Sequence, residues 1–194
     1  MHRVASRRAL TLLELLIAIA AASVIALAGT TLLTALTYAA SEQRDLRAVV
    51  GKSLAVGARL GAEVREAHLI LDANDNTLIL WLNDTDDDQQ PALSEILRIE
   101  AVPTDNTLKT YAFDLAATDT IYPLTTDFIA ETTARIASDD MTPRNWSRDV
   151  AAATFTLDNP DPQLARLLSY RIDFTTGNLT ETYANATALR NGGP

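Results

Sequence analysis

Apolar residues fill the N-terminal part of the chain almost without interruption. Between residues 10 and 41 the only charged side chain is that of Glu14, and the next charge is Glu42. A helix needs about 20 apolar residues to cross a bilayer, whereas the apolar core of a cleaved signal peptide has only about 7 to 15. The run contains no proline, so the pattern predicts one continuous transmembrane helix over residues 10–40. A central acidic residue in such a helix costs roughly 2.5 to 3.5 kcal/mol, which makes Glu14 a candidate functional residue.

The helical repeat continues through residues 41–67, but this stretch is amphipathic. Polar and charged residues flank apolar positions that recur at three- and four-residue steps, namely Leu46, Val49, Val50, Leu54, Leu60 and Val64. Gly51, Gly57 and Gly61 each weaken a helix by about 1 kcal/mol relative to alanine, so we expect a sheet or another helix to approach closely there. The four-residue spacing of Gly57 and Gly61 favours packing within the chain over a dimer contact.

Strand-like segments replace the helical repeat in residues 68–194. Two short apolar runs on either side of an Asn/Asp-rich loop are typical of a β-hairpin, and the remaining pattern predicts one short helix and five further strands. The predicted strands are 69–71, 78–82, 96–102, 108–115, 152–157, 167–174 and 179–183, and the helix is 127–138. This part of the chain is therefore expected to be one α+β domain, large enough to bury its own core.

Arginine residues are concentrated on one side of the apolar run. Arg3, Arg7 and Arg8 precede it, while acidic and basic residues are mixed on the other side, beginning with Glu42 and Arg44. This asymmetry favours an N-terminus in the cytoplasm and a C-terminal domain outside the membrane.

Residues 9–18 resemble the cleavage and methylation segment of type IV prepilins and type II secretion pseudopilins. In that family a short basic leader ends in a small residue, and an apolar helix follows with a glutamate at the fifth mature position. Here the leader is residues 1–9, and the mature chain begins with Leu10 and Thr11, so that Glu14 is fifth. The sequence departs from the family pattern in having Ala9 in place of glycine, Leu10 in place of phenylalanine, and Thr31 where major pilins often have proline.

The resemblance implies a role for each of these residues. Prepilin peptidase would cut between Ala9 and Leu10 and would methylate the new amine of Leu10. Glu14, next to Thr11 in the assembly segment, would pair with the Leu10 amine of a neighbouring subunit, because either charge alone is costly in hydrocarbon. The implied partners are other pilin-like subunits, prepilin peptidase, the inner-membrane assembly platform and, before assembly, membrane lipid.

The resemblance also implies a fold and a location. A pilin-like α+β chain packs a long N-terminal helix, transmembrane in its first half and amphipathic in its second, on an antiparallel β-sheet head. Chain length and head size are most similar to J-type or W-type minor subunits, and Glu14 distinguishes the chain from K-type tip subunits. Such a protein is a single-pass protein of the bacterial inner membrane with its head in the periplasm or outside the cell, and it enters a pseudopilus or pilus after assembly.

Composition argues against several other classes of protein. The formal net charge is −9, and it becomes −12 if the three leader arginines are removed, so we expect no nucleic-acid partner. The chain has no cysteine, which excludes disulfides and thiol catalysis. His68 is the only histidine beyond the leader, and no G-x-S-x-G, Walker or HExxH motif accompanies it. We therefore expect no enzyme activity and no cofactor, and a structural role for His68 where the helix gives way to a strand.

The densest acidic cluster lies in residues 83–88. Oxygen ligands at alternating positions suit Ca²⁺, which makes Asp84, Asp86, Asp87 and Asp88 a candidate calcium site. The segment lacks the glycine and the distal glutamate of an EF-hand loop, and a solvated loop is the alternative interpretation.

Two other functional classes remain open at this stage. The first is an exported soluble binding protein whose signal peptide is cleaved near Tyr38-Ala39-Ala40. The second is an uncleaved single-pass anchor that displays a binding head. The sequence favours a minor pilin-like structural subunit over both, because neither explains Glu14. It does not distinguish among secretion, pilus and competence systems.

Overall fold

The computed structural model describes residues 11–85, 87–177 and 179–190. The chain divides into two compact units, and the division falls between Asp45 and Leu46 within the helix α1 (Leu12–Glu66). The continuous helix predicted over 10–40 and 41–67 is confirmed within the described residues. The expected cleavage residues Ala9 and Leu10, and Asp86 of the acidic cluster, lie outside them.

The first unit consists, in its described part, of the N-terminal portion of α1. This portion is long and apolar enough to cross a membrane, and its side chains are exposed. Every serine and threonine between residues 12 and 41 donates a hydrogen bond from its hydroxyl to a backbone carbonyl three or four residues earlier. These residues are Ser23, Thr30, Thr31, Thr34, Thr37 and Ser41. The helix therefore satisfies the donors of its own serine and threonine hydroxyls, as apolar surroundings require.

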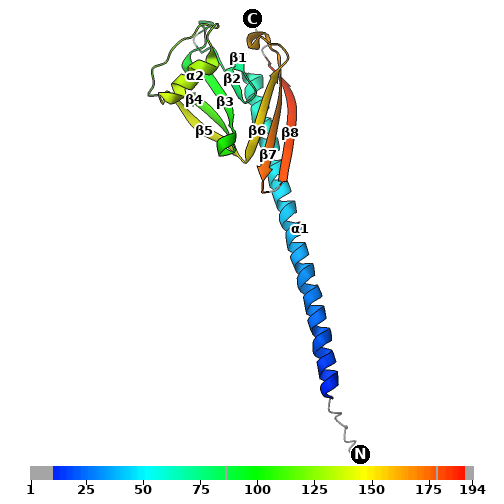
Figure 1. Cartoon of the computed structure of the whole chain (residues 1–194). Helices are drawn as coiled ribbons and strands as arrows, with labels where there is room; N and C mark the ends of the chain where they lie inside the picture. The colour runs from blue at the N-terminus through cyan, green and yellow to red at the C-terminus, as the bar shows by residue number, and fades with distance from the viewer. Residues whose placement is uncertain (1–10, 86, 178, 191–194) are drawn as a thin grey trace, which may run out of the picture. The chain divides into compact units, whose positions relative to one another are not determined.

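The second unit contains the last part of α1 and eight strands in two antiparallel sheets (Figure 1). The five-stranded sheet runs in the order β1 (Leu69–Ala73), β2 (Thr77–Trp81), β3 (Ile96–Val102), β4 (Thr107–Phe113) and β5 (Met141–Arg148). The three-stranded sheet runs in the order β6 (Val150–Leu157), β7 (Leu167–Thr176) and β8 (Leu179–Ala188). The second unit also contains α2 (Phe128–Ala137) and the short 3-10 helices η1 (Leu93–Glu95), η2 (Pro103–Asp105) and η3 (Pro162–Leu164).

The antiparallel pairing and α2 are confirmed, and the strands of the head form two sheets. The chain leaves the first sheet at Asp149, which has a left-handed φ of 66° between β5 and β6. Strand β5 was not predicted, because Pro143, Arg144 and Arg148 interrupt any apolar alternation. It forms through backbone pairing with β4 from Thr107↔Arg148 to Phe113↔Met141.

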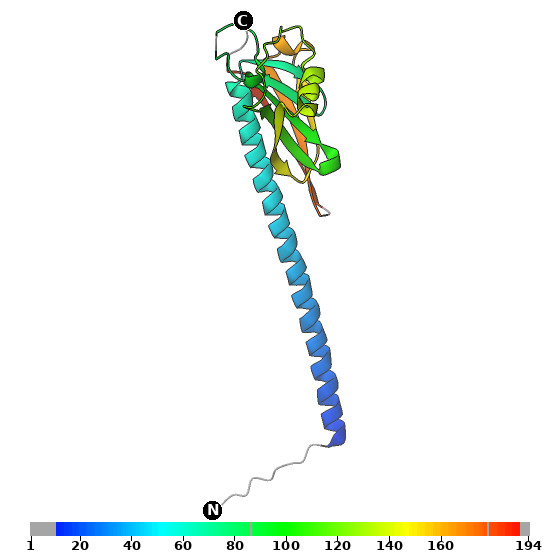
Figure 2. The ribbon, with the colours of Figure 1, turned by 90° about the vertical axis from the view of Figure 1, so that its left-hand side faces the viewer.

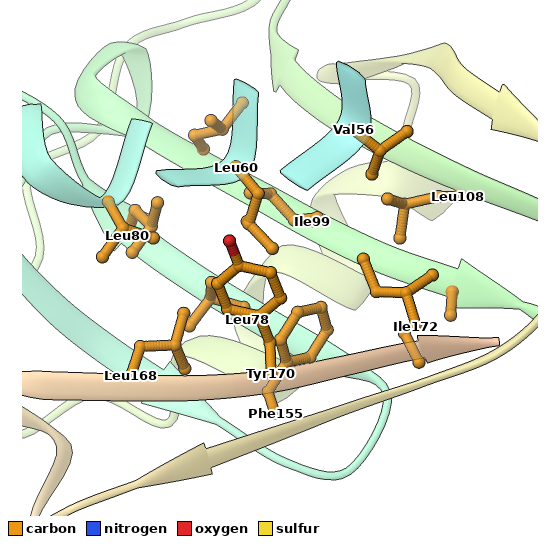
Figure 3. Packing of buried hydrophobic residues seen from close by; sticks show 14 of the residues in the cluster. Val56, Leu60, Leu78, Leu80, Ile99, Leu108, Phe155, Leu168, Tyr170 and Ile172 are labelled. Atoms are coloured by element: carbon orange, nitrogen blue, oxygen red, sulfur yellow. The ribbon is translucent and has the colours of Figure 1, made fainter. Parts of the chain in front are cut away.

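The main core lies between the last part of α1 and the inner faces of both sheets. Val56 and Leu60 project from the helix toward apolar side chains of the strands (Figure 3). The partners shown there are Leu78, Leu80, Ile99, Leu108, Phe155, Leu168, Tyr170 and Ile172. Strand β2 is buried on both faces, because Leu78 and Leu80 belong to this core while Ile79 and Trp81 pack on the opposite side with α2.

Strand β8 approaches α1 closely at two glycines. A Cβ atom built on Gly57 would overlap the ring of Tyr183, and one on Gly61 would lie 3.3 Å from Oγ1 of Thr187. The hydroxyl of Tyr170 also donates to the carbonyl oxygen of Gly57 at 3.1 Å. The prediction that Gly57 and Gly61 serve packing within the chain is confirmed. The close approach expected at Gly51 is wrong, because nothing lies within 4 Å of a Cβ atom built there. Figure 2 shows this part of α1 beside the strands of the second unit.

Candidate functional site

Thr11 and Glu14 form a reciprocal hydrogen-bonded pair at the start of α1. The backbone N–H of Thr11 donates to Oε2 of Glu14 at 2.9 Å, and the Thr11 hydroxyl donates to the same oxygen at 3.1 Å. In return, the backbone N–H of Glu14 donates to the Thr11 hydroxyl oxygen at 3.3 Å. The backbone carbonyl of Thr11 accepts the N–H of Leu15 at 3.1 Å, which begins the helical ladder.

This arrangement is a capping box, in which an N-cap threonine and a glutamate three residues later each satisfy a backbone donor of the other. The first four N–H groups of a helix have no partner within the helix, and leaving them bare in apolar surroundings is costly. Sequence reasoning identified both residues but missed this relationship. The pattern T-x-x-E before an apolar run was the signal that would have revealed it.

The capping box leaves part of the Glu14 carboxylate available. Both donors from Thr11 reach Oε2, and Oε1 accepts no hydrogen bond within the described residues. The helix N-terminus also favours a negative charge at this position. The site can therefore hold an ionised carboxylate in a fixed place and offer one oxygen to a donor from outside the helix.

In the loop of the acidic cluster, Asp84 and Asp88 accept hydrogen bonds from backbone N–H groups that follow them in the chain. Asp84 uses both oxygens to accept the backbone N–H groups of Asp88 and Gln89, at 3.2 and 3.0 Å. Asp88 in turn accepts the N–H of Gln90 at 2.7 Å. Within the described residues no group of three or more His, Cys, Asp or Glu side chains is placed to hold a metal ion. Calcium binding by this cluster stays a prediction, since Asp86 lies outside the described residues.

Glu95 anchors this loop from the buried side, a role that sequence reasoning missed. Its carboxylate accepts the indole N–H of Trp81 at 2.9 Å, the backbone N–H of Thr85 at 2.6 Å and that of Ala92 at 3.2 Å, and it also accepts the Thr85 hydroxyl. Burial by itself raises the pKa of Glu95, but these hydrogen bonds outweigh burial and hold its pKa below the ordinary value. Glu95 is therefore a buried ionised residue that orders the start of the loop.

His68 lies between α1 and β1, as the sequence analysis placed it. Its backbone N–H donates to the carbonyl of Trp81 at 2.7 Å, and its exposed ring packs edge-on against the Trp81 ring with centroids 4.5 Å apart. This placement fits a structural role for His68 at the junction of helix and sheet.

Comparisons with known proteins add no family to this description. A scan against family models finds no match, and searches of curated proteins and of solved structures find none either.

Proposed function

We propose that the chain is a minor pilin-like structural subunit of a type II secretion pseudopilus or a type IV pilus. Prepilin peptidase removes residues 1–9 and methylates the amine of Leu10. The N-terminal helix holds the subunit in the bacterial inner membrane, with its N-terminus cytoplasmic, until the assembly platform inserts it among other pilin-like subunits. The head contributes contacts between subunits and no chemistry of its own.

The single observation that carries the proposal is the Glu14 carboxylate, held by Thr11 in the first turn of a helix that has no other charge before Glu42. A plain membrane anchor gains only helix capping from Glu14, whereas a helix that must find an axial partner also gains a charge that can pair. Thr11 fixes Oε2 of Glu14, and Oε1 stays open to an outside donor. An α-amine at Leu10 is such a donor, and two opposite charges in hydrocarbon reduce each other's desolvation cost by pairing.

The capping box strengthens the proposal in one further respect. Cleavage before Leu10 leaves Thr11 inside the mature chain, so the box survives processing. The Glu14 carboxylate is then held by Thr11, the residue next to the new amine of Leu10. Pairing within one helix and pairing with a neighbouring helix thus compete for the same oxygen atom.

Identification of the mature N-terminus tests the proposal. The full-length chain is expressed with and without prepilin peptidase, and its N-terminal residue is determined by sequencing and mass spectrometry. We expect a chain that begins at N-methylated Leu10 only when the peptidase is present. A start near Ser41 would instead identify a cleaved signal peptide and an exported soluble binding protein. An intact Met1 in both samples would identify an uncleaved anchor.

A further inference from the structure

A cavity of about 610 Å³ opens on the head where α1 gives way to β1. Segments that are far apart in the sequence line it, including His68, Trp81, Asp84, Asp87, Leu124 and Leu164. Its volume lies within the range of about 300 to 1,000 Å³ that is typical of ligand sites. None of the lining residues belongs to the capping box, so the cavity is separate from the site proposed for assembly.

One wall of the cavity is apolar. Leu69 and Trp81 form its buried side, and Leu124 and Leu164 extend it toward solvent. Leu164 is 61% exposed, so its side chain is available to a ligand that enters. The Trp81 ring is held in place by its N–H bond to Glu95 and by the edge of the His68 ring. The wall is therefore preformed, which lowers the entropic cost of binding.

The lining also includes two carboxylates that have no basic partner within the described residues. Asp84 is fixed by backbone N–H groups, and Asp87 makes no hydrogen bond or ion pair with any residue that the structure describes. The described lining contains neither lysine nor arginine. Other carboxylates of the head do have such partners, for example Asp140 with Arg135 and Glu100 with Arg98.

We infer that this cavity binds an arginine side chain carried by a segment of a partner polypeptide. An arginine combines an aliphatic stem, which suits Leu124 and Leu164, with a planar cation whose N–H groups suit the two carboxylates. One arginine side chain does not fill the cavity, so we expect the residues that flank it in the partner to occupy the remaining volume. This inference does not rest on the proposed filament role, since any partner with an exposed arginine satisfies it.

Titration of the full-length chain in detergent with short peptides tests the inference. The probe is an acetylated and amidated Leu-Arg-Leu peptide, and its matched competitors replace arginine with citrulline or with glutamate. Isothermal titration calorimetry is expected to detect the arginine peptide, to show at least about tenfold weaker binding of citrulline, and to detect no glutamate peptide. Binding should also weaken as salt is added, because the carboxylates are partly exposed.

Two aspartates with the same backbone conformation provide a matched pair of variants. Asp87 and Asp139 are both exposed and have left-handed φ values of 59° and 62°, which asparagine tolerates well. Asp87→Asn is expected to weaken the arginine peptide about threefold to tenfold, and Asp139→Asn to leave it unchanged. Equal binding of the arginine and citrulline peptides would overturn the inference, as would an unchanged affinity in Asp87→Asn. Methylguanidinium binding as tightly as the peptide would overturn the assignment to a polypeptide.

Discussion

The ring of Tyr183 in β8 lies directly against Gly57 of α1, with no space for a methyl group between them. The same helix carries Gly51, around which nothing lies within 4 Å of a built Cβ atom. Two glycines six residues apart in one helix thus have opposite environments, and alanine substitution should separate them.

We expect Gly57→Ala to lower the free energy of unfolding of the head by about 1 to 3 kcal/mol, because the methyl group must displace the Tyr183 ring. Gly51→Ala is expected to raise it by about 0.5 to 1 kcal/mol through reduced backbone entropy of the unfolded chain. Thermal denaturation of the full-length chain in detergent, followed by circular dichroism, measures both. Equal effects of the two substitutions would show that the contact between β8 and α1 carries no strain.

Substitutions at Glu14 and Thr11 separate helix capping from charge pairing. Glu14→Gln keeps an acceptor for Thr11 and therefore keeps the capping box, but it removes the negative charge. Loss of an ion pair in apolar surroundings costs about 3 to 5 kcal/mol, so we expect this variant to insert into the membrane but to enter filaments poorly.

Thr11→Val is the complementary variant. It removes the hydroxyl that accepts from Glu14 while the carboxylate remains, at a cost of about 0.5 to 2 kcal/mol in helix stability. Incorporation into sheared filaments, measured by immunoblot against total membrane protein, should fall much less than for Glu14→Gln. If Thr11→Val instead lowered filament incorporation more than Glu14→Gln does, the role of Glu14 would be helix capping alone.

The buried carboxylate of Glu95 predicts a specific dependence of stability on pH. Its pKa is lower in the folded chain than its ordinary value of 4.5, so ionisation favours folding. This contribution is fully present above pH 4.5 and is lost as the pH falls through the lower folded pKa. In Glu95→Gln the amide N–H groups face the Trp81 and Ala92 donors, so we expect a loss of about 1 to 3 kcal/mol near neutral pH.

Melting temperatures measured from about pH 7 to about pH 3 check this prediction, because the difference between wild type and Glu95→Gln should shrink at the acid end. The exposed Glu66 offers a control, since Glu66→Gln should leave both the melting temperature and its slope nearly unchanged. A constant difference between wild type and Glu95→Gln across the pH range would contradict the role assigned to ionised Glu95.

Two arginines that pair with an acidic residue two positions later differ sharply in burial. The Arg98 side chain is 6% exposed, and its guanidinium also donates to the Ile129 carbonyl and to the hydroxyls of Thr132 and Thr133 in α2. The Arg171 side chain, paired with Asp173, is 61% exposed.

We expect Arg98→Met to destabilise the head by about 2 to 4 kcal/mol, because it leaves several polar groups of α2 and Glu100 without their donor. Arg171→Met should change the stability by less than about 0.5 kcal/mol. Urea denaturation of the full-length chain followed by tryptophan fluorescence compares the two. If both variants lost similar stability, the ion pair that each arginine makes within its strand would determine the stability. The bonds from Arg98 to α2 would then contribute little.

Local patterns were sufficient to predict the elements whose side chains repeat regularly. The uncharged run from Leu15 onward and the apolar segment 78–82 each identify their element within a few residues. Strand β5 could not be predicted, because its side chains are mostly polar and its extended conformation is stabilised by backbone pairing with β4. The division into two sheets falls at Asp149, whose left-handed conformation cannot be read from a local apolar pattern.

The candidate sites show the same contrast between contacts within a few residues and contacts between distant segments. Thr11 and Glu14 are three residues apart, so their pairing was readable from the chain. The anchoring of Thr85 by Glu95, and the cavity that joins His68 to Leu164, depend on how distant segments are folded together. Sequence patterns report contacts within a few residues far better than contacts of this kind.

The self-bonded hydroxyls of the apolar helix have a consequence for how it chooses its neighbours. From Ser23 to Ser41 every serine and threonine hydroxyl donates to one of the helix's own carbonyls, so these side chains on the flank of the helix offer no donor to an adjacent helix. Such a flank can slide and rotate against a similar surface with little energetic preference. In the proposed filament, the vertical position of one helix beside another is then decided near its end, where Glu14 supplies the one charge among residues 11–41.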